Sequence, residues 1–596
     1  MFLGWSDWCV IAAYFLVTLL LGLRFVKASS KNLEGYILGG RDLPWWVAGI
    51  SMVATTFAAD TPLAVTELVA KNGISGNWLW WNMLTGGMLT VFFFSKLWRR
   101  SGVKTEVELI TLRYGGKAAH ILRVFRSLYL GLFMNVLILG WVNLAFMTIL
   151  GVFFGLNREE QLFWTLGVMI ITTFYTSLSG LLGVAYTDAI QFIIAMVGCI
   201  YLAIRIVSAP AIGGLEGLVA KLPPQTLDFF PDILGSNAAG SLSITLGSFI
   251  IFAGIQWWAS WYPGAEPGGG GYVAQRMMST RTEKGSLFAT LFFQVAHYAL
   301  RPWPWILVAL ATLILYPNLP EADYKLGYVY AMRDYLPEGW RGLLLAAFLG
   351  AYMSTLSTQL NWGAGYLIND AWVPLKKLSP DHPSLVWMSR LTVVALMFLS
   401  LFSTYWMNSI TQVWEFILQC GAGLGLVLIL RWYWWRINVW SEVSATLIPF
   451  LVIGVLYLND IKDFETVYFW TASLTTVGWI LITYLTPPEN HNTLTTFWNQ
   501  VKPEGAWQPI TGVRFLGGLH IRQGIVLWIL SIIMTYAMLF AIGKFLLGFV
   551  STALVWTGVA FLTAFILYRY LPVWLAYVQE DSHNSTNNNN THASGG

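Results

Sequence analysis

Apolar runs long enough to cross a lipid bilayer dominate this chain of 596 residues. A membrane-spanning helix needs about 20 consecutive, mostly apolar residues. Apolar residues make up 56% of the chain and charged residues only 11%, which leaves more apolar surface than a water-soluble fold can bury. We therefore predict an all-α polytopic membrane protein with about fifteen transmembrane helices. The predicted helices span residues 6–27, 44–70, 78–98, 119–155, 162–180, 184–207, 243–264, 285–316, 341–372, 384–405, 411–433, 439–458, 466–485, 525–547 and 550–576.

The distribution of Lys and Arg predicts the orientation of the chain, because cytoplasmic loops carry an excess of these residues. Basic clusters around 96–104 and 276–284 fall on one side of the predicted membrane, and the opposite loop 208–242 has a single basic residue, Lys221. We expect a multi-pass protein of the plasma (inner) membrane with its N-terminus outside and its C-terminus in the cytoplasm. The first apolar run follows Asp7 rather than a basic segment and is long enough to span, so we interpret it as a retained helix.

Two of the predicted helices are interrupted by residues that break helices. The second predicted helix (44–70) contains "ATTFAADTP" (54–62), and the seventh predicted helix (243–264) continues into "YPGAEPGGGG" (262–271). Because they lie five helices apart, they open two five-helix blocks, 44–207 and 243–433, of which the second is inverted. Paired interruptions of this kind indicate the midplane binding site of a secondary transporter. Ordinary proline kinks are the alternative.

A stripe of small and hydroxyl-bearing residues follows one face of the predicted helix 341–372. It consists of Ala351, Ser354, Thr355 and Thr358, with Ser357 beside it and Asn361 extending it. Their spacing of i, i+3, i+4 and i+7 places these residues on one helical face. Hydroxyl and carbonyl oxygens are hard ligands of the kind that sodium requires. Close packing between membrane helices is the alternative reason for such residues.

Several polar and aromatic side chains in the predicted helices have no obvious place in lipid. Arg301 lies in the middle of "HYALRPWPWILVALA" and either anchors a solute carboxylate or hydroxyl or pairs internally with Asp60 or Glu266. Trp257 and Trp258 are expected to stack on a sugar ring or to gate the site, with packing as the alternative.

Residues 34–435 resemble the solute:sodium symporter family, which has a leucine-transporter-type fold of five-plus-five inverted repeats with discontinuous helices 2 and 7. The resemblance rests on "GGRDLPWWVAGISMVATTFAADT", "GLLGVAYTDAIQF", "QRMMSTRTEKG" and "AAFLGAYMSTLSTQLN…D". It implies a transporter rather than an enzyme, with sodium as coupling ion and no other cofactor.

The resemblance also implies ion-binding residues. The main sodium site would use the carbonyls of Ala54, Phe57 and Ala351 and the hydroxyls of Ser354 and Thr355. A second sodium site, present in some members, would map to Asp188, Ser354, Ser357 and Thr358. Asp188 also stands near the start of a helix, where a carboxylate is favourable without any ion.

The solute is less well defined, because sugar-carrying members have amide and glutamate side chains where this chain has Thr55, Thr56, Asp60 and Thr61. Candidate solute contacts are Thr56, Asp60, Gln256, Trp257, Trp258, Arg301 and Asn361. We favour sodium-coupled symport of a sugar or sugar acid by alternating access. Symport of an amino acid or another small organic solute remains open, as does a symporter-like membrane sensor.

The remaining expectations concern organisation and partners. The predicted units are 1–43 (a peripheral first helix and loop), the repeats 44–207 and 243–433, 434–576 (peripheral helices with a cytoplasmic loop at 486–524) and a disordered tail at 577–596. The expected partners are sodium, a small solute and the lipid bilayer, without nucleic acid, and the protein is expected to be monomeric.

Overall fold

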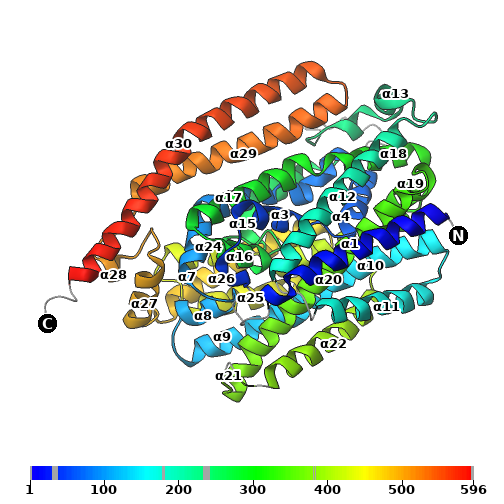
Figure 1. Ribbon diagram of the computed structural model, residues 1–596. Helices are drawn as coiled ribbons and strands as arrows, with labels where there is room; N and C mark the ends of the chain where they lie inside the picture. The colour runs from blue at the N-terminus through cyan, green and yellow to red at the C-terminus, as the bar shows by residue number, and fades with distance from the viewer. Residues whose placement is uncertain are drawn as a thin grey trace.

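A computed structural model describes residues 3–29, 38–176, 181–231, 242–379, 382 and 384–591. These residues form a bundle of helices without a β-strand (Figure 1). Within this part of the chain, nine helices are long and apolar enough to cross a membrane, or eleven when each of two bent pairs counts as one span. The all-helical membrane class follows, and the count of fifteen spans stays a prediction.

The first half of the chain supplies the helices that surround the first interruption. They are α1 (Trp5–Ser29), α3 (Trp45–Thr55), α4 (Asp60–Asn72), α5 (Trp78–Trp81), α6 (Met83–Leu89), η3 (Thr90–Phe94), α7 (Ser95–Ser101), α8 (Glu108–Arg113), α9 (Gly116–Leu128), η4 (Tyr129–Met134), α10 (Asn135–Phe154), α11 (Arg158–Thr176), α12 (Leu181–Val207) and α13 (Gly214–Lys221). The short 3-10 helices are η1 (Gly39–Arg41), η2 (Ile74–Asn77) and η5 (Pro224–Leu227).

The second half begins with the helices around the other interruption. They are α14 (Leu246–Ile251), η6 (Phe252–Gln256), α15 (Trp257–Ala259), α16 (Gly271–Ser279), α17 (Glu283–Val295), η7 (Ala296–Leu300), α18 (Trp303–Leu315), η8 (Glu321–Asp323), α19 (Leu326–Tyr335), α20 (Trp340–Gly365), η9 (Tyr366–Trp372), α21 (Val373–Lys376), α22 (Ser384–Tyr405), α23 (Ile410–Cys420) and α24 (Leu424–Tyr433). The chain continues with α25 (Val439–Leu458), α26 (Phe464–Leu485), α27 (His491–Val501), α28 (Gln508–Thr511), α29 (Gly518–Leu546) and α30 (Val550–Thr591).

Helical structure is interrupted at three places in the core. The axes of α3 and α4 differ by 56° across residues 56–59. Helix α15 ends at Ala259 and α16 begins at Gly271, so residues 260–270 form an irregular segment. The segment 411–433 was expected to be one continuous helix, but α23 and α24 are bent by 50°.

The bend between α23 and α24 arises where their backbone meets the second interruption. Trp261 donates its N–H to the carbonyl of Gly421 at 3.3 Å, and Gly423 donates to the carbonyl of Ala259 at 2.9 Å. A β-carbon on Gly421 would lie 2.6 Å from the carbonyl oxygen of Trp261, so only glycine permits this approach. The second interruption and the α23–α24 bend therefore supply hydrogen-bond partners for each other's backbone groups, as the interior of a membrane protein requires.

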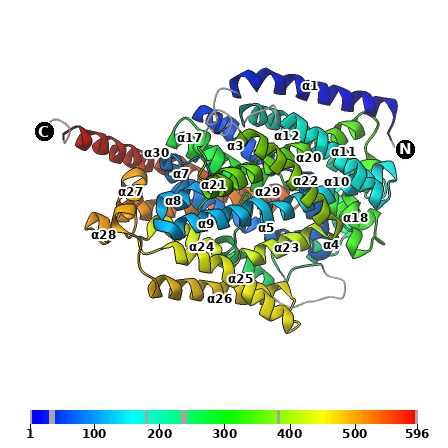
Figure 2. The same ribbon diagram turned by 90° about the horizontal axis from the view of Figure 1, so that it is seen from below.

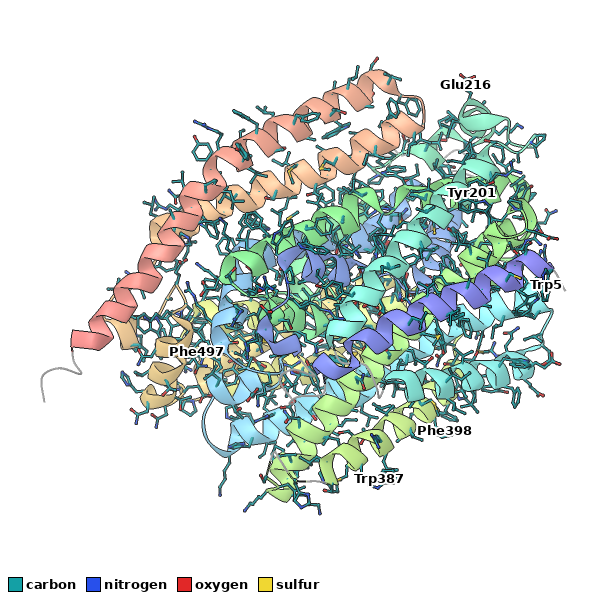
Figure 3. The ribbon with its side chains drawn as sticks, viewed as in Figure 1. Trp5, Tyr201, Glu216, Trp387, Phe398 and Phe497 are labelled. Carbon is teal, nitrogen blue, oxygen red and sulfur yellow. The ribbon has the colours of Figure 1, made fainter. Side chains whose placement is uncertain are left out.

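Peripheral helices enclose the core. Helix α1 packs against α12 and α20 at one edge, and α25 and α26 pack together at another (Figure 2). Helices α29 and α30 run side by side outside the core (Figure 1). Large apolar side chains point outward from the peripheral helices, such as Trp387 and Phe398 of α22, which are 61% and 54% exposed (Figure 3). An apolar outer surface of this kind suits a bilayer and not water.

The start of α1 and the end of α30 lie at opposite ends of the bundle (Figure 1). The segment 486–524, expected to be a loop, contains α27, α28 and the start of α29. Glu504 in this segment lies 3.2 Å from Lys96 and 2.7 Å from His520. Burial raises the pKa of Glu504, but the contacts with His520 and Lys96 outweigh burial and hold the pKa below its ordinary value.

Helix α30 extends to Thr591. The disordered tail at 577–596 stays a prediction, and residues 592–596 lie outside the described residues.

Candidate ion and solute site

A small cavity lies beside the first interruption. It is lined by Ala54, Phe57, Asp188, Gln191, Phe192, Ala351 and Ser354 and has a volume of about 10 Å³. This volume is close to that of one water-sized sphere, which is also the size class of a dehydrated monovalent ion. Residues from the α3–α4 break, α12 and α20 meet here, although they lie far apart in the sequence.

The hydroxyl and carboxyl groups at this cavity include atoms without partners. The Ser354 hydroxyl donates to Asp188 Oδ1 at 2.5 Å. Asp188 Oδ2 and the neighbouring Thr355 Oγ1 are buried and have no hydrogen-bond partner among the described residues. Unpartnered buried oxygens are costly, and a hard cation is the partner that such oxygens suit. The donor set therefore fits sodium, carried as a transported ion.

Some residues expected for the two sodium sites line the same cavity, whereas Thr355, Ser357 and Thr358 are not among its lining residues. Asp188 was assigned to the second site, yet it lines the same cavity as Ala54 and Ala351 of the main site. Ser357 donates its hydroxyl to the carbonyl of Ser354 at 3.0 Å, and Thr358 is partly buried nearby on the same helix.

A polar network surrounds Thr56 at the first interruption. Arg301, only 1% exposed, donates through Nη1 to Thr56 Oγ1 at 3.1 Å and to the carbonyl of Val53 at 3.2 Å. His297 lies 3.0 Å from Thr56 Oγ1 through Nδ1 and 3.4 Å from Arg301 Nη2 through Nε2. Because an arginine N–H only donates, His297 Nε2 accepts and Nδ1 carries the ring proton toward Thr56. Arg301 Nε has no partner among the described groups.

Asp60 lies in the first turn of α4 and is 5% exposed. It borders a cluster of aromatic side chains, here called the aromatic group, which consists of Trp141, Tyr262 and Trp414. Trp141 donates its indole N–H to Asp60 Oδ2 at 2.8 Å. The rings of Trp141 and Tyr262 are stacked with centroids 6.4 Å apart, and Trp414 meets both at 6.4 and 6.1 Å. Within the described chain Asp60 forms no ion pair with Arg301, so the internal pair considered from sequence is not formed. Arg301 also makes no ion pair with Glu266 among these residues.

The other predicted solute contacts lie in different surroundings. Gln256 donates to the carbonyl of Leu79 at 2.7 Å, and its Oε1 is buried without a partner among the described groups. Trp257 packs against Trp528 of α29, and Trp258 donates to the carbonyl of Gly254 on its own helix. Asn361 is partly buried on α20.

Sequence reasoning missed the residues that complete the polar and aromatic network. They are His297, Trp141, Tyr262 and Trp414. His297 carried a usable signal, because a lone histidine inside an apolar helix is unusual. The tryptophans carried none, since 32 tryptophans occur in the chain and most are indistinguishable by pattern.

An all-helical bundle with an ion-sized, oxygen-lined cavity at an interrupted helix is typical of ion-coupled membrane transporters. Comparison with known proteins defines the family. Residues 36–448 match the model of the sodium:solute symporter family, and the chain belongs to this family.

Individual relatives are more distant. The chain is 24% identical over 498 residues to sodium/myo-inositol cotransporter 2 of Oryctolagus cuniculus. This alignment covers 76% of this chain and 71% of the relative. The chain is 26% identical over 463 residues to the sodium/glucose cotransporter of Vibrio parahaemolyticus. This alignment covers 72% of this chain and 81% of the relative. Among solved structures, a Na+-coupled sialic acid symporter in a substrate-bound outward-open state aligns with a TM-score of 0.65 and 20% identity, covering 82% of this chain and 99% of that one. This last likeness shows the shared fold.

Proposed function

We propose that this protein carries a sugar or sugar acid across the membrane together with sodium, by alternating access. The observation that carries the proposal is the cavity of about 10 Å³ lined by Ala54, Phe57, Asp188, Ala351 and Ser354. Membership of the sodium:solute symporter family supports sodium as the coupling ion.

In this proposal the first interruption joins ion binding to solute binding. Carbonyl groups of Ala54, Phe57 and Ala351 and the hydroxyls of Ser354 and Thr355 coordinate sodium. Ligands on both α3 and α20 hold these helices together when the ion is bound, which favours one conformation of the break. Asp188, Ser357 and Thr358 serve a second sodium ion or modify the first.

The solute would lie beyond the break, between the network of Arg301 and the aromatic group at Asp60. Aromatic faces such as Trp141 suit the apolar C–H face of a sugar ring, and Asp60 accepts hydroxyl hydrogen bonds. Arg301 presents an unpartnered Nε–H, which suits a carboxylate or hydroxyl. Thr56, Gln256, Trp257, Trp258 and Asn361 remain proposed contacts of the same solute.

Symport of an amino acid is the second candidate. The observation that favours it is that Asp60 and Arg301 carry opposite charges without pairing in the described structure. A zwitterion would meet both charges, its ammonium group at Asp60 and its carboxylate at Arg301.

The proposed setting is the plasma (inner) membrane, with the N-terminus outside and the C-terminus in the cytoplasm. The repeats 44–207 and 243–433 would rock around the site, and 434–576 would support them. We further propose that the protein is monomeric, has no enzymatic activity and requires no cofactor besides the coupling ion.

The test is uptake into proteoliposomes that contain the purified full-length protein. Radiolabelled sugars, polyols, sugar acids and amino acids are supplied with an inward sodium gradient or with potassium in its place. We expect accumulation of one solute class with sodium only. Accumulation that is equal in potassium, or sodium-independent solute binding, would contradict the proposal.

A further inference from the structure

The second interruption contains a buried carboxyl group that the proposed transport of sodium and solute does not use. Glu266 lies in "YPGAEPGGGG" and is 3% exposed. Its Oε2 atom has no hydrogen-bond partner in the described part of the chain. The backbone carbonyl of Glu266 accepts from Gly269 at 2.8 Å, so a tight turn holds the residue in place.

A second carboxyl group, that of Glu106, approaches the same turn from the segment before α8. Glu106 is 6% exposed, and its Oε2 accepts from the Gly271 N–H at 2.7 Å and from the Tyr366 hydroxyl at 3.5 Å. A β-carbon on Gly271 would lie 2.6 Å from Glu266 Oε1. Both carboxyl groups therefore border Gly271, where a φ of +50° and this lack of space require glycine.

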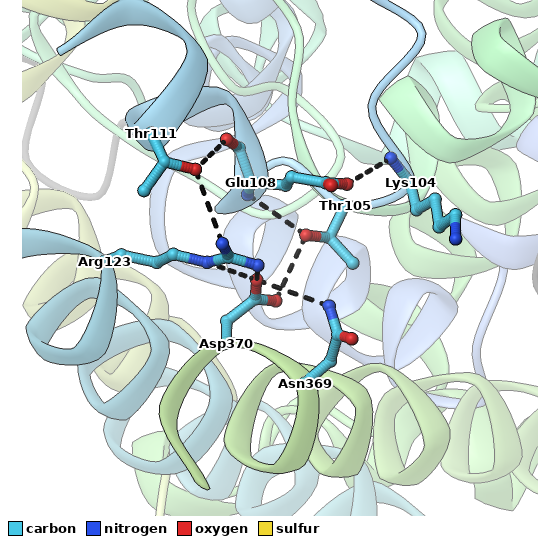
Figure 4. A network of polar contacts seen from close by, with 7 residues as sticks. All are labelled: Lys104, Thr105, Glu108, Thr111, Arg123, Asn369 and Asp370. Carbon is cyan, nitrogen blue, oxygen red and sulfur yellow. Dashed lines mark hydrogen bonds and ion pairs between the residues drawn. The ribbon is translucent and has the colours of Figure 1, made fainter. Parts of the chain in front are cut away.

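The cationic side chains around these two glutamates are committed to other acids. Arg126 and Arg431 each lie 3.1 Å from Glu442. Arg123 lies 2.6 Å from Asp370, which also accepts from Thr105, the residue before Glu106 (Figure 4). Among the described residues, neither Glu106 nor Glu266 forms an ion pair.

The groups that act electrostatically on the two glutamates come from several elements. Tyr272 of α16 and Tyr366 of η9 interact with Glu266, which also interacts with Glu106. Arg431 of α24, Arg126 of α9 and Glu442 of α25 act on Glu106. Arg126 and Arg431 are already paired with Glu442, so an ionised Glu266 would add a second buried negative charge beside Glu106.

Two buried carboxyl groups that border one glycine are unfavourable when both are ionised. The Gly271 N–H and the Tyr366 hydroxyl both donate to Glu106, which identifies it as the ionised member. The backbone N–H groups of Gly264 and Glu266 act on the Glu266 carboxyl group, but its Oε2 atom has no donor among the described groups. A proton on Glu266 removes the cost of a buried charge. A divalent ion is a poorer occupant, because the described residues contain no group of three or more metal-ligating acids, histidines or cysteines.

We propose that Glu266 is a proton-binding site, which is protonated in this conformation while the neighbouring Glu106 is ionised. The site lies in the irregular segment between α15 and α16, which borders the α23–α24 bend. When that segment opens to water, Glu266 becomes hydrated and releases the proton. Proton binding thereby favours the conformation described here, and the transport rate depends on pH through this residue. The inference goes beyond the proposed function, because its ligand is neither sodium nor the solute.

The direct test is infrared difference spectroscopy of the purified full-length protein during a pH titration in detergent. The wild-type protein is expected to show the C=O stretch of a protonated, poorly hydrated carboxyl group at neutral pH. Glu266→Gln should remove this band. Glu321→Gln, whose side chain is 71% exposed, serves as the matched control and should retain it.

Two further variants keep the test decisive if Glu266→Gln folds poorly. Glu266→Asp retains a carboxyl group, so its band should shift in frequency rather than vanish. Glu106→Gln removes the competing negative charge, so the Glu266 band should disappear at a lower pH than in the wild type. An unchanged spectrum in both Glu266 variants would overturn the proposal.

The transport measurement is sodium-driven uptake in proteoliposomes at several pH values. The wild-type rate should change with pH, and the Glu266→Gln rate should be nearly constant across the same range. A Glu266→Gln profile that matches the wild type would contradict the link to transport. Because the infrared test requires neither sodium nor a solute, its result is independent of whether the proposed sodium symport is correct.

Discussion

The two core interruptions that carry functional candidates differ in length and in how their side chains are satisfied. The first comprises four residues (56–59) between α3 and α4, and the second comprises eleven (260–270) between α15 and α16. At the first, Thr56 contacts His297 and Arg301, and neighbouring Asp60 accepts from Trp141. At the second, Glu266 Oε2 has no partner within the described structure.

The two interruptions therefore suit different ligands. A short break with fixed donors and acceptors presents a preorganised surface, which favours selective binding of an ion and a solute. A long glycine-rich break allows close backbone approach, as at Gly271, and holds a carboxyl group whose charge changes with its environment.

The largest effect is expected from Thr355→Ala and Ser354→Ala. Each change removes a proposed hydroxyl ligand in a site that water cannot easily enter, so sodium is left under-coordinated. Sodium half-saturation should rise by about 10–100-fold, or uptake should be lost. Sodium-dependent uptake in proteoliposomes measures this. Thr563→Ala on α30 is the matched control, because this buried hydroxyl bonds, within the described structure, to carbonyl groups of its own helix. Unchanged sodium affinity in both site variants would remove these residues from the ion site.

Asp60→Asn is expected to have the next largest effect. Since Asp60 forms no ion pair with Arg301 in the described structure, the variant should be expressed and folded like the wild type. A charge-assisted hydrogen bond to the solute is worth about 1.5–3 kcal/mol, so the solute half-saturation should rise roughly 10- to 100-fold. Expression, thermal stability and uptake are measured on the same preparation. A loss of stability with normal solute affinity would instead assign Asp60 a purely structural role.

Asp188→Asn should produce a smaller effect that is confined to sodium. The amide oxygen still accepts from Ser354, but the negative charge beside the cavity is lost. We expect a sodium half-saturation raised roughly tenfold or a reduced sodium-to-solute ratio. Both are obtained from the sodium dependence of uptake and from parallel sodium and solute fluxes. Wild-type values for both would leave Asp188 with a structural role only, as the acceptor of the Ser354 hydroxyl hydrogen bond.

Much of the architecture was predictable because membrane helices carry a strong local signal. Runs of apolar residues located the helices, and Pro and Gly marked the interruptions at 54–62 and 262–271. The bend at Gly421 was missed, since its cause is the backbone of Trp261, some 160 residues earlier in the chain. Likewise, no local pattern indicated that 486–524 contains α27 and α28.

The candidate ion site was predictable only in part. Hydroxyl spacing on 341–372 and the family motifs selected Ser354 and Thr355, and the structure places Ser354 at an ion-sized cavity beside Ala54. That Asp188 shares this cavity depends on how α12 packs against α3 and α20, which no spacing within one helix reveals. The bonds from Trp141 to Asp60 and from Arg301 to Thr56 join segments far apart in the sequence, so the pairing of Asp60 and Arg301 could not be decided from sequence.

The smallest effect is expected from Trp141→Phe, which separates orientation from charge at Asp60. Phenylalanine keeps most of the contact with Tyr262 and Trp414 but lacks the N–H that donates to Asp60 Oδ2 at 2.8 Å. Asp60 retains its charge and its bond to the solute but loses a fixed direction. A hydrogen bond of this kind contributes about 0.5–1.5 kcal/mol net, so the solute half-saturation should rise roughly two- to tenfold while the sodium half-saturation stays unchanged. Trp414→Phe, which removes an indole N–H without a described partner, is the control and should have less effect. If Trp141→Phe impairs sodium binding as strongly as solute binding, the aromatic group supports the whole break rather than the solute side alone, and the first interruption is a single cooperative site.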